Sequence, residues 1–130
     1  MSPVVVLFAL LLISTSLAFR LPTKMNAAEN TGVSLPKKFY ALRYTYVENM
    51  EERRAPVRAE HLDLIKEYEE AGSCVMGGAF INPIDGGFLL FETEEAAQEF
   101  VSKDPYVSND LVPSYDIREY MVVSGTAFKN

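Results

Sequence analysis

The sequence is poor in the residues that build metal centres and disulfides. Its 130 residues include one cysteine, Cys74, one histidine, His61, and no tryptophan. A single cysteine cannot form an intrachain disulfide, and one Cys with one His is too few for a structural zinc site. The lack of paired cysteines weakly favours a reducing compartment or an ordinary core position for Cys74. The sequence therefore predicts no metal site and no cofactor.

Positive charge is also scarce. The chain carries 12 Lys and Arg against 18 Asp and Glu, a net charge of −6. Phosphate binding needs clustered basic side chains that release counterions. The one dense basic cluster, formed by Arg53, Arg54 and Arg58, stands among glutamates that neutralise it. The composition argues against a nucleic-acid partner.

A hydrophobic run long enough to span a membrane is missing. The apolar run from Val4 to Ile13 has 10 residues, whereas a spanning helix needs about 20. A run of this length suits a signal peptide, and Ser16 and Ala18 supply small residues at the −3 and −1 positions of a cleavage site. We predict a signal peptide over residues 1–18 and no membrane segment in the mature form; a buried N-terminal strand or helix is the alternative.

Residues 19–38 form a second presequence segment, a transit peptide or linker. It is rich in small and polar residues and shows no core periodicity. Phe19 follows the predicted cut directly, and Arg20-Leu21-Pro22 comes next. This arrangement resembles the bipartite plastid-targeting presequences of algae with secondary plastids. It implies entry into the secretory pathway and a plastid location, with plain secretion as the alternative.

Residues 39–130 are predicted to form one α+β domain. Alternation and β-branched or aromatic content predict four strands, over residues 39–47, 73–81, 88–91 and 115–123. Apolar spacing predicts one helix that starts near Pro56 and is ended by Gly72, and a second that is capped by Thr93 and runs to Lys103. The segment from Glu48 to Ala55 is expected to be irregular.

The element order is therefore βαββαβ, which is typical of a ferredoxin-like fold with two helices on one face of an antiparallel sheet. The opposite face of the sheet needs a cover, and a second copy of the chain is the simplest one. A domain of this size is marginally stable alone, so a homodimer is expected.

His61 is the leading candidate for a functional residue. It lies on the apolar stripe of the first helix, so its ring points inward, and each ring nitrogen of a buried imidazole needs a partner. Asp104, which ends the second helix before Pro105, is the best partner for Nδ1. An aspartate there would fix the tautomer and leave Nε2 as a general base. His61 as a satisfied core histidine and Asp104 as a plain helix terminator are the alternatives.

Three further sites are candidates for substrate binding. Arg58 lies one helical turn before His61 and suits an anionic group, although a surface ion pair with a glutamate explains it as well. Gly77 and Gly78 leave a gap in a strand, which marks a ligand notch, a bulge or a dimer contact. Tyr106 either packs beneath the helix end or lines the pocket with its hydroxyl.

These residues resemble the YCII-related (YciI-like) family in their order and spacing. The resemblance rests on Arg58-Ala-Glu-His61, Gly77-Gly78-Ala79, Asp104-Pro105-Tyr106 and Asp116-Ile-Arg118, and it covers about Phe39 to Val123. It implies a ferredoxin-like domain that dimerises into an α+β barrel. It also implies a pocket where His61 and Asp104 form a catalytic pair acting on small molecules, with elimination or lyase chemistry on aromatic or quinol-like compounds as one possibility.

Two classes of function remain open from the sequence. The first is a small enzyme that uses His61 as general base on a small organic substrate. The second is a non-catalytic binding or sensing module that uses the same pocket. Haem-dependent oxygen chemistry is a remote third, because a histidine paired with an aspartate needs no metal to explain it.

Overall fold

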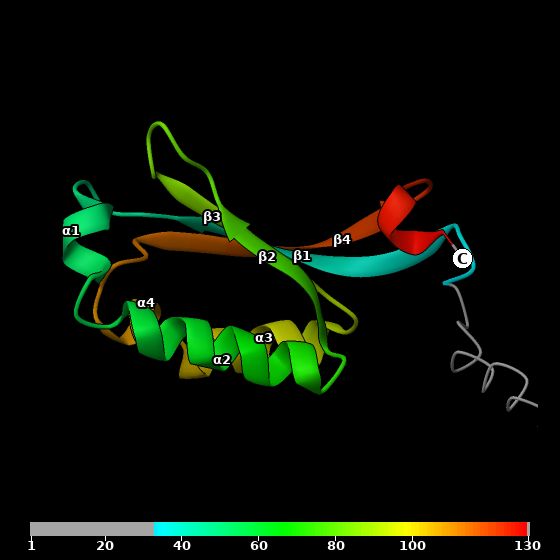
Figure 1. Ribbon diagram of the computed structural model, residues 1–130, viewed down its shortest axis with the longest axis horizontal. Coiled ribbons are helices and arrows are strands. Elements are labelled where there is room, and N and C mark those ends of the chain that lie inside the picture. Colours follow the sequence, from blue (N-terminus) through cyan, green and yellow to red (C-terminus); the bar gives the residue numbers. More distant parts are fainter. Residues whose placement is uncertain (1–32, 130) are drawn as a thin grey trace, which may run out of the picture. The chain divides into compact units, whose positions relative to one another are not determined.

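The computed structural model describes residues 33–129. The predicted signal peptide, and residues 19–32 of the predicted transit segment, lie outside the described residues. The described part consists of a four-stranded antiparallel sheet with helices packed on one of its faces (Figure 1). Its elements are β1 (Lys37–Thr45), α1 (Met50–Arg54), α2 (Arg58–Glu70), β2 (Cys74–Ala79), β3 (Gly86–Phe91), α3 (Glu94–Lys103), α4 (Pro105–Ser108), β4 (Ser114–Val122) and the short 3-10 helix η1 (Thr126–Phe128).

The strand order is β2-β3-β1-β4, and every neighbouring pair is antiparallel. Each half of the domain contributes a strand, a main helix and a second strand, and the two halves interleave at the centre of the sheet. This confirms the predicted ferredoxin-like α+β fold. None of the described helices is long and apolar enough to cross a membrane.

The helix α3 begins and ends where the sequence predicts, and α2 ends before Gly72 as predicted but begins at Arg58 rather than near Pro56, which lies in the preceding turn. The Thr93 hydroxyl accepts a hydrogen bond from the Ala96 N–H at 3.1 Å and caps α3. Gly72 follows α2 with a φ of +73°, a left-handed conformation that glycine adopts without strain. These two signals fix the lengths of α2 and α3 and hence the positions of the residues they carry.

The first strand lies two residues earlier than predicted. The pairing with β4 extends back to Lys37, opposite Val122. At the other end, the Tyr46 N–H donates to the Asp85 carbonyl and the Val47 N–H to the Leu111 carbonyl, so both residues have left the strand ladder. The backbone partners, rather than the aromatic content, determine where β1 ends.

The prediction that residues 48–55 are irregular is wrong, because residues 50–54 form α1. Met50 is buried and anchors this turn to the core. Glutamates in the first turn and arginines in the last turn complement the helix dipole. The helix was not predicted from the sequence because only one of its five residues is apolar and no apolar periodicity marks it.

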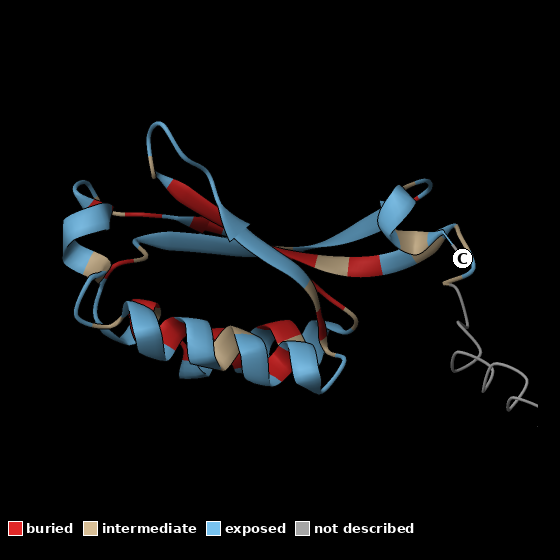
Figure 2. Cartoon of the chain, viewed as in Figure 1, coloured by how far each residue is buried: buried red, intermediate tan, exposed pale blue. Residues whose placement is uncertain are grey.

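The sheet has a covered face and an open face. Leu42, Leu89 and Phe91 of the sheet and Phe100 of α3 belong to the main core cluster. Buried segments line the sides on which the sheet and the helices face each other (Figure 2). The open face carries a second apolar cluster, defined by Phe39, Ala41, Leu90 and Val122.

Candidate functional site

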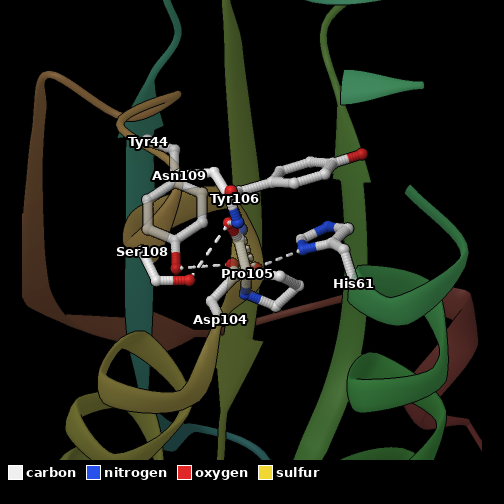
Figure 3. A network of polar contacts seen from close by, with 7 residues as sticks. All are labelled: Tyr44, His61, Asp104, Pro105, Tyr106, Ser108 and Asn109. Carbon is white, nitrogen blue, oxygen red and sulfur yellow. Dashed lines mark hydrogen bonds and ion pairs between the residues drawn. The ribbon is translucent and has the colours of Figure 1, made fainter. Parts of the chain in front are cut away.

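Asp104 lies at the junction of α3 and α4, where it caps the N-terminus of the shorter helix. It is 1% exposed. Its Oδ1 accepts the Tyr106 N–H at 2.9 Å, and its Oδ2 accepts the Tyr44 hydroxyl at 2.9 Å. Its Oδ1 also lies 2.7 Å from Nδ1 of His61 (Figure 3). A carboxylate buried in this way is held in one orientation by contacts from three separate segments.

These contacts define the tautomer of His61. A carboxylate can only accept hydrogen bonds, so Nδ1–H donates a hydrogen bond to Asp104 Oδ1. Nε2 is then an unprotonated acceptor in the neutral ring. No described residue forms a hydrogen bond with Nε2. The imidazole therefore has one nitrogen fixed by the protein and one available to a ligand.

The ring of His61 is also held by aromatic contacts. It is 5% exposed and stacks on the ring of Tyr106, with a centroid separation of 3.7 Å and an interplanar angle of 6°. The ring of Phe100 meets it edge-on at 6.2 Å. Stacking on one face and a hydrogen bond at one edge leave little rotational freedom, which favours a preorganised site.

Two tyrosines of the first strand and its extension surround the pair. Burial raises the pKa of the Tyr44 phenol, and the negative charge of Asp104 raises it further. Burial likewise raises the pKa of Tyr46. Both hydroxyls therefore stay protonated across the physiological range, and Tyr44 acts as a permanent hydrogen-bond donor to the carboxylate.

A pocket of about 190 Å³ lies beside the imidazole. Because an apolar cavity of roughly 150 Å³ can hold benzene, this pocket has the size of a one-ring compound. Asp104 does not line the pocket; it contacts Nδ1 of the His61 ring. The polar side chains in the lining are Tyr46, Arg54, Arg58, His61 and Tyr106.

The apolar wall of the pocket is formed by α2 and the two strands nearest to it. Leu62 and Ile65 contribute from the helix, and Leu89 contributes from β3. The edge strand β2 borders this wall through Gly77 and Gly78. A Cβ at Gly77 would lie 3.2 Å from the Leu89 side chain, whereas a Cβ at Gly78 would meet nothing within 4 Å. Gly77 is thus required for close packing, and Gly78 is not.

The structure brings together all six residues singled out in the sequence. His61, Arg58, Gly77, Gly78 and Tyr106 line one pocket, and Asp104 contacts His61 directly. Tyr106 combines both expected positions, since its ring packs under His61 and also borders the pocket. Whether these residues act on a substrate stays a prediction.

Three residues of the site were not found from the sequence. Tyr44 and Tyr46 were not singled out, and Arg54 was counted as part of a neutralised charge cluster. The strand alternation that places Tyr44 and Tyr46 on one face was a usable signal. For Arg54 the signal was obscured, because Pro56 separates it from the helix that carries Arg58.

Two other sequence features lie away from the pocket. The Asp116 carboxylate pairs with the Arg43 guanidinium, one strand away on the open face of the sheet. Cys74 is buried in the core, and burial raises the pKa of its thiol to about 11. A thiol with that pKa is a poor nucleophile at neutral pH.

The fold and the site define a small ferredoxin-like α+β domain with a buried His–Asp pair beside a one-ring pocket. The chain belongs to the YCII-related domain family, whose model matches residues 38–121. No curated protein sequence matches the chain at a significant level.

The chain is similar to several solved structures. One is a 5-chloro-2-hydroxyhydroquinone dehydrochlorinase from Burkholderia phenoliruptrix, in complex with 2,5-dihydroxybenzoquinone. It matches with a TM-score of 0.55 and 17% identity, covering 63% of this chain and 92% of its own. Another is a protein of unknown function from Nitrosomonas europaea, with a TM-score of 0.48 and 17% identity, covering 70% of this chain and 93% of its own.

Proposed function

We propose that the protein is a small-molecule enzyme in which His61 acts as the general base. The observation that carries this proposal is the 2.7 Å contact between His61 Nδ1 and Asp104 Oδ1, combined with the position of the same ring in the pocket wall. Asp104 holds the tautomer and stabilises the imidazolium that forms when Nε2 accepts a proton. Asp104 itself needs no contact with the substrate.

We further propose an elimination (lyase-type) reaction. In such a step Nε2 takes a proton from the substrate, the freed electron pair forms a new double bond, and a leaving group departs with the electrons of its own bond. The Burkholderia relative, named a dehydrochlorinase, supports this class. The pocket size supports a one-ring substrate.

The test uses the full-length chain with 5-chloro-2-hydroxyhydroquinone as probe. Chloride release and the NMR spectrum of the ring report turnover, and ligand-observed NMR reports binding. His61→Gln keeps a hydrogen-bonding side chain of similar size but cannot act as a base. We expect it to lose turnover by about 10²–10⁴-fold with little change in affinity. Asp63→Asn, on the exposed face of the same helix, is the matched control and should retain full turnover.

A binding or sensing module would give a different pattern. The wild-type chain would bind the probe without releasing chloride, and His61→Gln would bind it equally well. If the wild-type chain neither turns over nor binds this probe or other hydroxylated one-ring compounds, the proposed chemistry is wrong.

We also propose that the protein works as a homodimer through the open face of the sheet. The members of the apolar cluster defined above are themselves buried, but the same face also carries Met76, 54% exposed, and Tyr120, 48% exposed. A second copy offers a matching surface. Sedimentation should show a dimer that Met76→Lys combined with Tyr120→Lys dissociates, whereas Glu67→Lys on the exposed side of α2 leaves it intact. A wild-type monomer at about 100 μM would contradict this proposal.

For the cellular location we propose entry into the secretory pathway followed by delivery to a plastid. The support is the apolar run ending at Ile13, the small residues before Phe19 and the following Arg20-Leu21-Pro22. Residues 1–38 fused to a fluorescent protein in an alga with a secondary plastid provide the test. Fluorescence in the culture medium would indicate plain secretion instead.

A further inference from the structure

Arg54 has an unmet hydrogen-bonding requirement. Its Nε–H is buried, and it is the one buried side-chain nitrogen or oxygen among the described residues that has no hydrogen-bond partner. Leaving a buried donor unsatisfied is costly, and more so when it belongs to a charged group. Arg54 also lines the pocket beside His61. A ligand acceptor in the pocket would satisfy this donor.

The pocket holds a second guanidinium. Arg54 is the last residue of α1 and Arg58 the first of α2, and the turn between them is closed by the Val57 N–H donating to the Arg54 carbonyl at 3.0 Å. Both arginines line the pocket. The positive charges of both oppose the rise that burial causes in the pKa of Tyr106, and a side-chain hydrogen bond from Arg54 to that phenol opposes it as well. Part of the Arg54 guanidinium therefore contacts Tyr106, whereas its Nε–H has no partner.

Nothing in the pocket wall neutralises this charge. The lining contains no aspartate and no glutamate. Within residues 33–129, neither Arg54 nor Arg58 forms an ion pair. Asp104, behind the imidazole, is already occupied by three donors. Two arginines without an ion-pair partner among the described residues thus line this pocket, although the chain as a whole has a net charge of −6. Local positive charge of this kind favours the binding of an anion.

We propose that the pocket selects a one-ring anion whose oxyanion is bound by Arg54 and Arg58. The oxyanion is a carboxylate or a phenolate, because both present the acceptor oxygens that a guanidinium binds. Arg54 donates Nε–H to it, and Arg58 adds the second positive charge. The ring lies against Leu62, Ile65 and Leu89. This inference rests on the proposed function, for which it names the substrate class.

The spacing along α2 supports a division of labour. Arg58 lies three residues before His61, so both are on one side of the helix, one turn apart. An anion held at Arg54 and Arg58 would place the remainder of the ring near Nε2. Arg54 and Arg58 therefore act on binding and orientation, and His61 acts on the proton.

The test measures affinity in the full-length chain by ligand-observed NMR. The anionic probes are benzoate and 4-nitrophenol, and the assay is run at pH 8 so that the phenol is largely ionised. The neutral isostere benzamide is the third probe. We expect an anion to bind at least about tenfold more tightly than benzamide, with an affinity that falls as salt is added. Which of the two anions binds better distinguishes a carboxylate from a phenolate site.

Four variants separate the roles. Arg54→Met should weaken anion binding by about tenfold to a hundredfold, and Arg54→Lys, which keeps the charge but lacks Nε–H, should be intermediate. Arg58→Met should weaken it to a lesser degree. Arg53→Met is the matched control, because Arg53 is the exposed neighbour on α1 and is absent from the pocket wall; its affinity should equal that of the wild type.

Stability provides an independent check. Because Arg54 buries a donor that no described residue satisfies, Arg54→Met should leave the melting temperature unchanged or higher. A purely structural arginine would lower it. Equal binding of benzamide and the anions, equal affinity of Arg54→Met and Arg53→Met, or no binding of either anion at about 10 mM would each overturn the proposal.

The anion site and the enzyme can fail separately. If anions bind through Arg54 but no hydroxylated one-ring compound is turned over, the enzymatic proposal fails and the anion site stands. A second outcome is that chloride is released from the probe, but Arg54→Met binds the anions as tightly as the wild type does and benzamide binds as tightly as the anions do. In that case the enzymatic proposal stands and the anion site fails. His61→Gln should keep the wild-type affinity for anions within about threefold in both cases.

Discussion

The rings of His61 and Tyr106 lie parallel, 3.7 Å apart, and the backbone N–H of the same Tyr106 donates to the carboxylate that orients His61. Tyr106 thus contacts the imidazole through its ring and the Asp104 carboxylate through its backbone N–H. The geometry couples the position of the His61 imidazole to the conformation of the short helix α4.

Asp104→Asn should change the tautomer of His61. An asparagine offers one acceptor and one donor group where the carboxylate accepts three hydrogen bonds, so Nδ1–H loses its preference and a mixture of tautomers forms. Because His61 is the one histidine in the sequence, its ring ¹⁵N signals can be assigned without ambiguity. We also expect a loss of about 1–3 kcal/mol in the free energy of unfolding. Unchanged ¹⁵N shifts would show that Asp104 does not set the tautomer.

Tyr44→Phe should destabilise the protein without altering the shape of the core. The change removes the hydroxyl that donates to Asp104 Oδ2 at 2.9 Å, and the buried oxygen then lacks that donor. The expected cost is about 1–2 kcal/mol in urea unfolding. Tyr115→Phe, at a half-exposed position of β4, is the control and should cost almost nothing. Equal effects of the two changes would contradict a role for the Tyr44 hydroxyl.

Gly77→Ala should weaken ligand binding, and Gly78→Ala should not. The new methyl group at Gly77 lies 3.2 Å from Leu89, which is itself buried, so the leucine must shift at the pocket wall. An affinity loss of about tenfold or more is expected, since one extra carbon in an apolar pocket is worth roughly 1–3 kcal/mol. At Gly78 the added methyl group meets open space. Equal binding by both variants would place the ligand away from this wall.

Stability should fall at high pH through Cys74. Its thiol has a pKa raised from 9.0 to about 11 by burial. The folded state therefore keeps the proton where the unfolded chain loses it, and stability present below pH 9 declines as the pH rises toward 11. Comparing urea unfolding at pH 8 and pH 10.5 in the wild type and Cys74→Ala isolates this contribution. The variant should lose less stability over that interval; parallel curves would argue against the shift.

Much of the fold could be predicted because its signals are local. The apolar stripe through His61, the cap at Thr93 and the glycine at position 72 each act within a few residues, and the structure has them as predicted. The His61–Asp104 contact was predicted for a similar reason, since a helix-ending Asp-Pro has few conformations available.

The remainder depended on contacts between distant segments. The end of β1 is determined by the carbonyls of Asp85 and Leu111, which no local pattern reveals. Tyr44 donates a hydrogen bond to Asp104 only because the fold brings the two residues together, although they are 60 residues apart in the sequence. The partnerless state of Arg54 is likewise a property of the folded pocket. From the sequence, the positive charge of Arg54 was interpreted as neutralised by neighbouring glutamates.

The division of the domain into two interleaved halves has a consequence for how function is acquired. His61 belongs to the first half and Asp104 to the second, 43 residues later. Neither half contains a complete pair, so a partly folded chain or a fragment has no oriented imidazole. If His61 transfers a proton as proposed, activity in a refolding experiment should appear with the native state and never ahead of it.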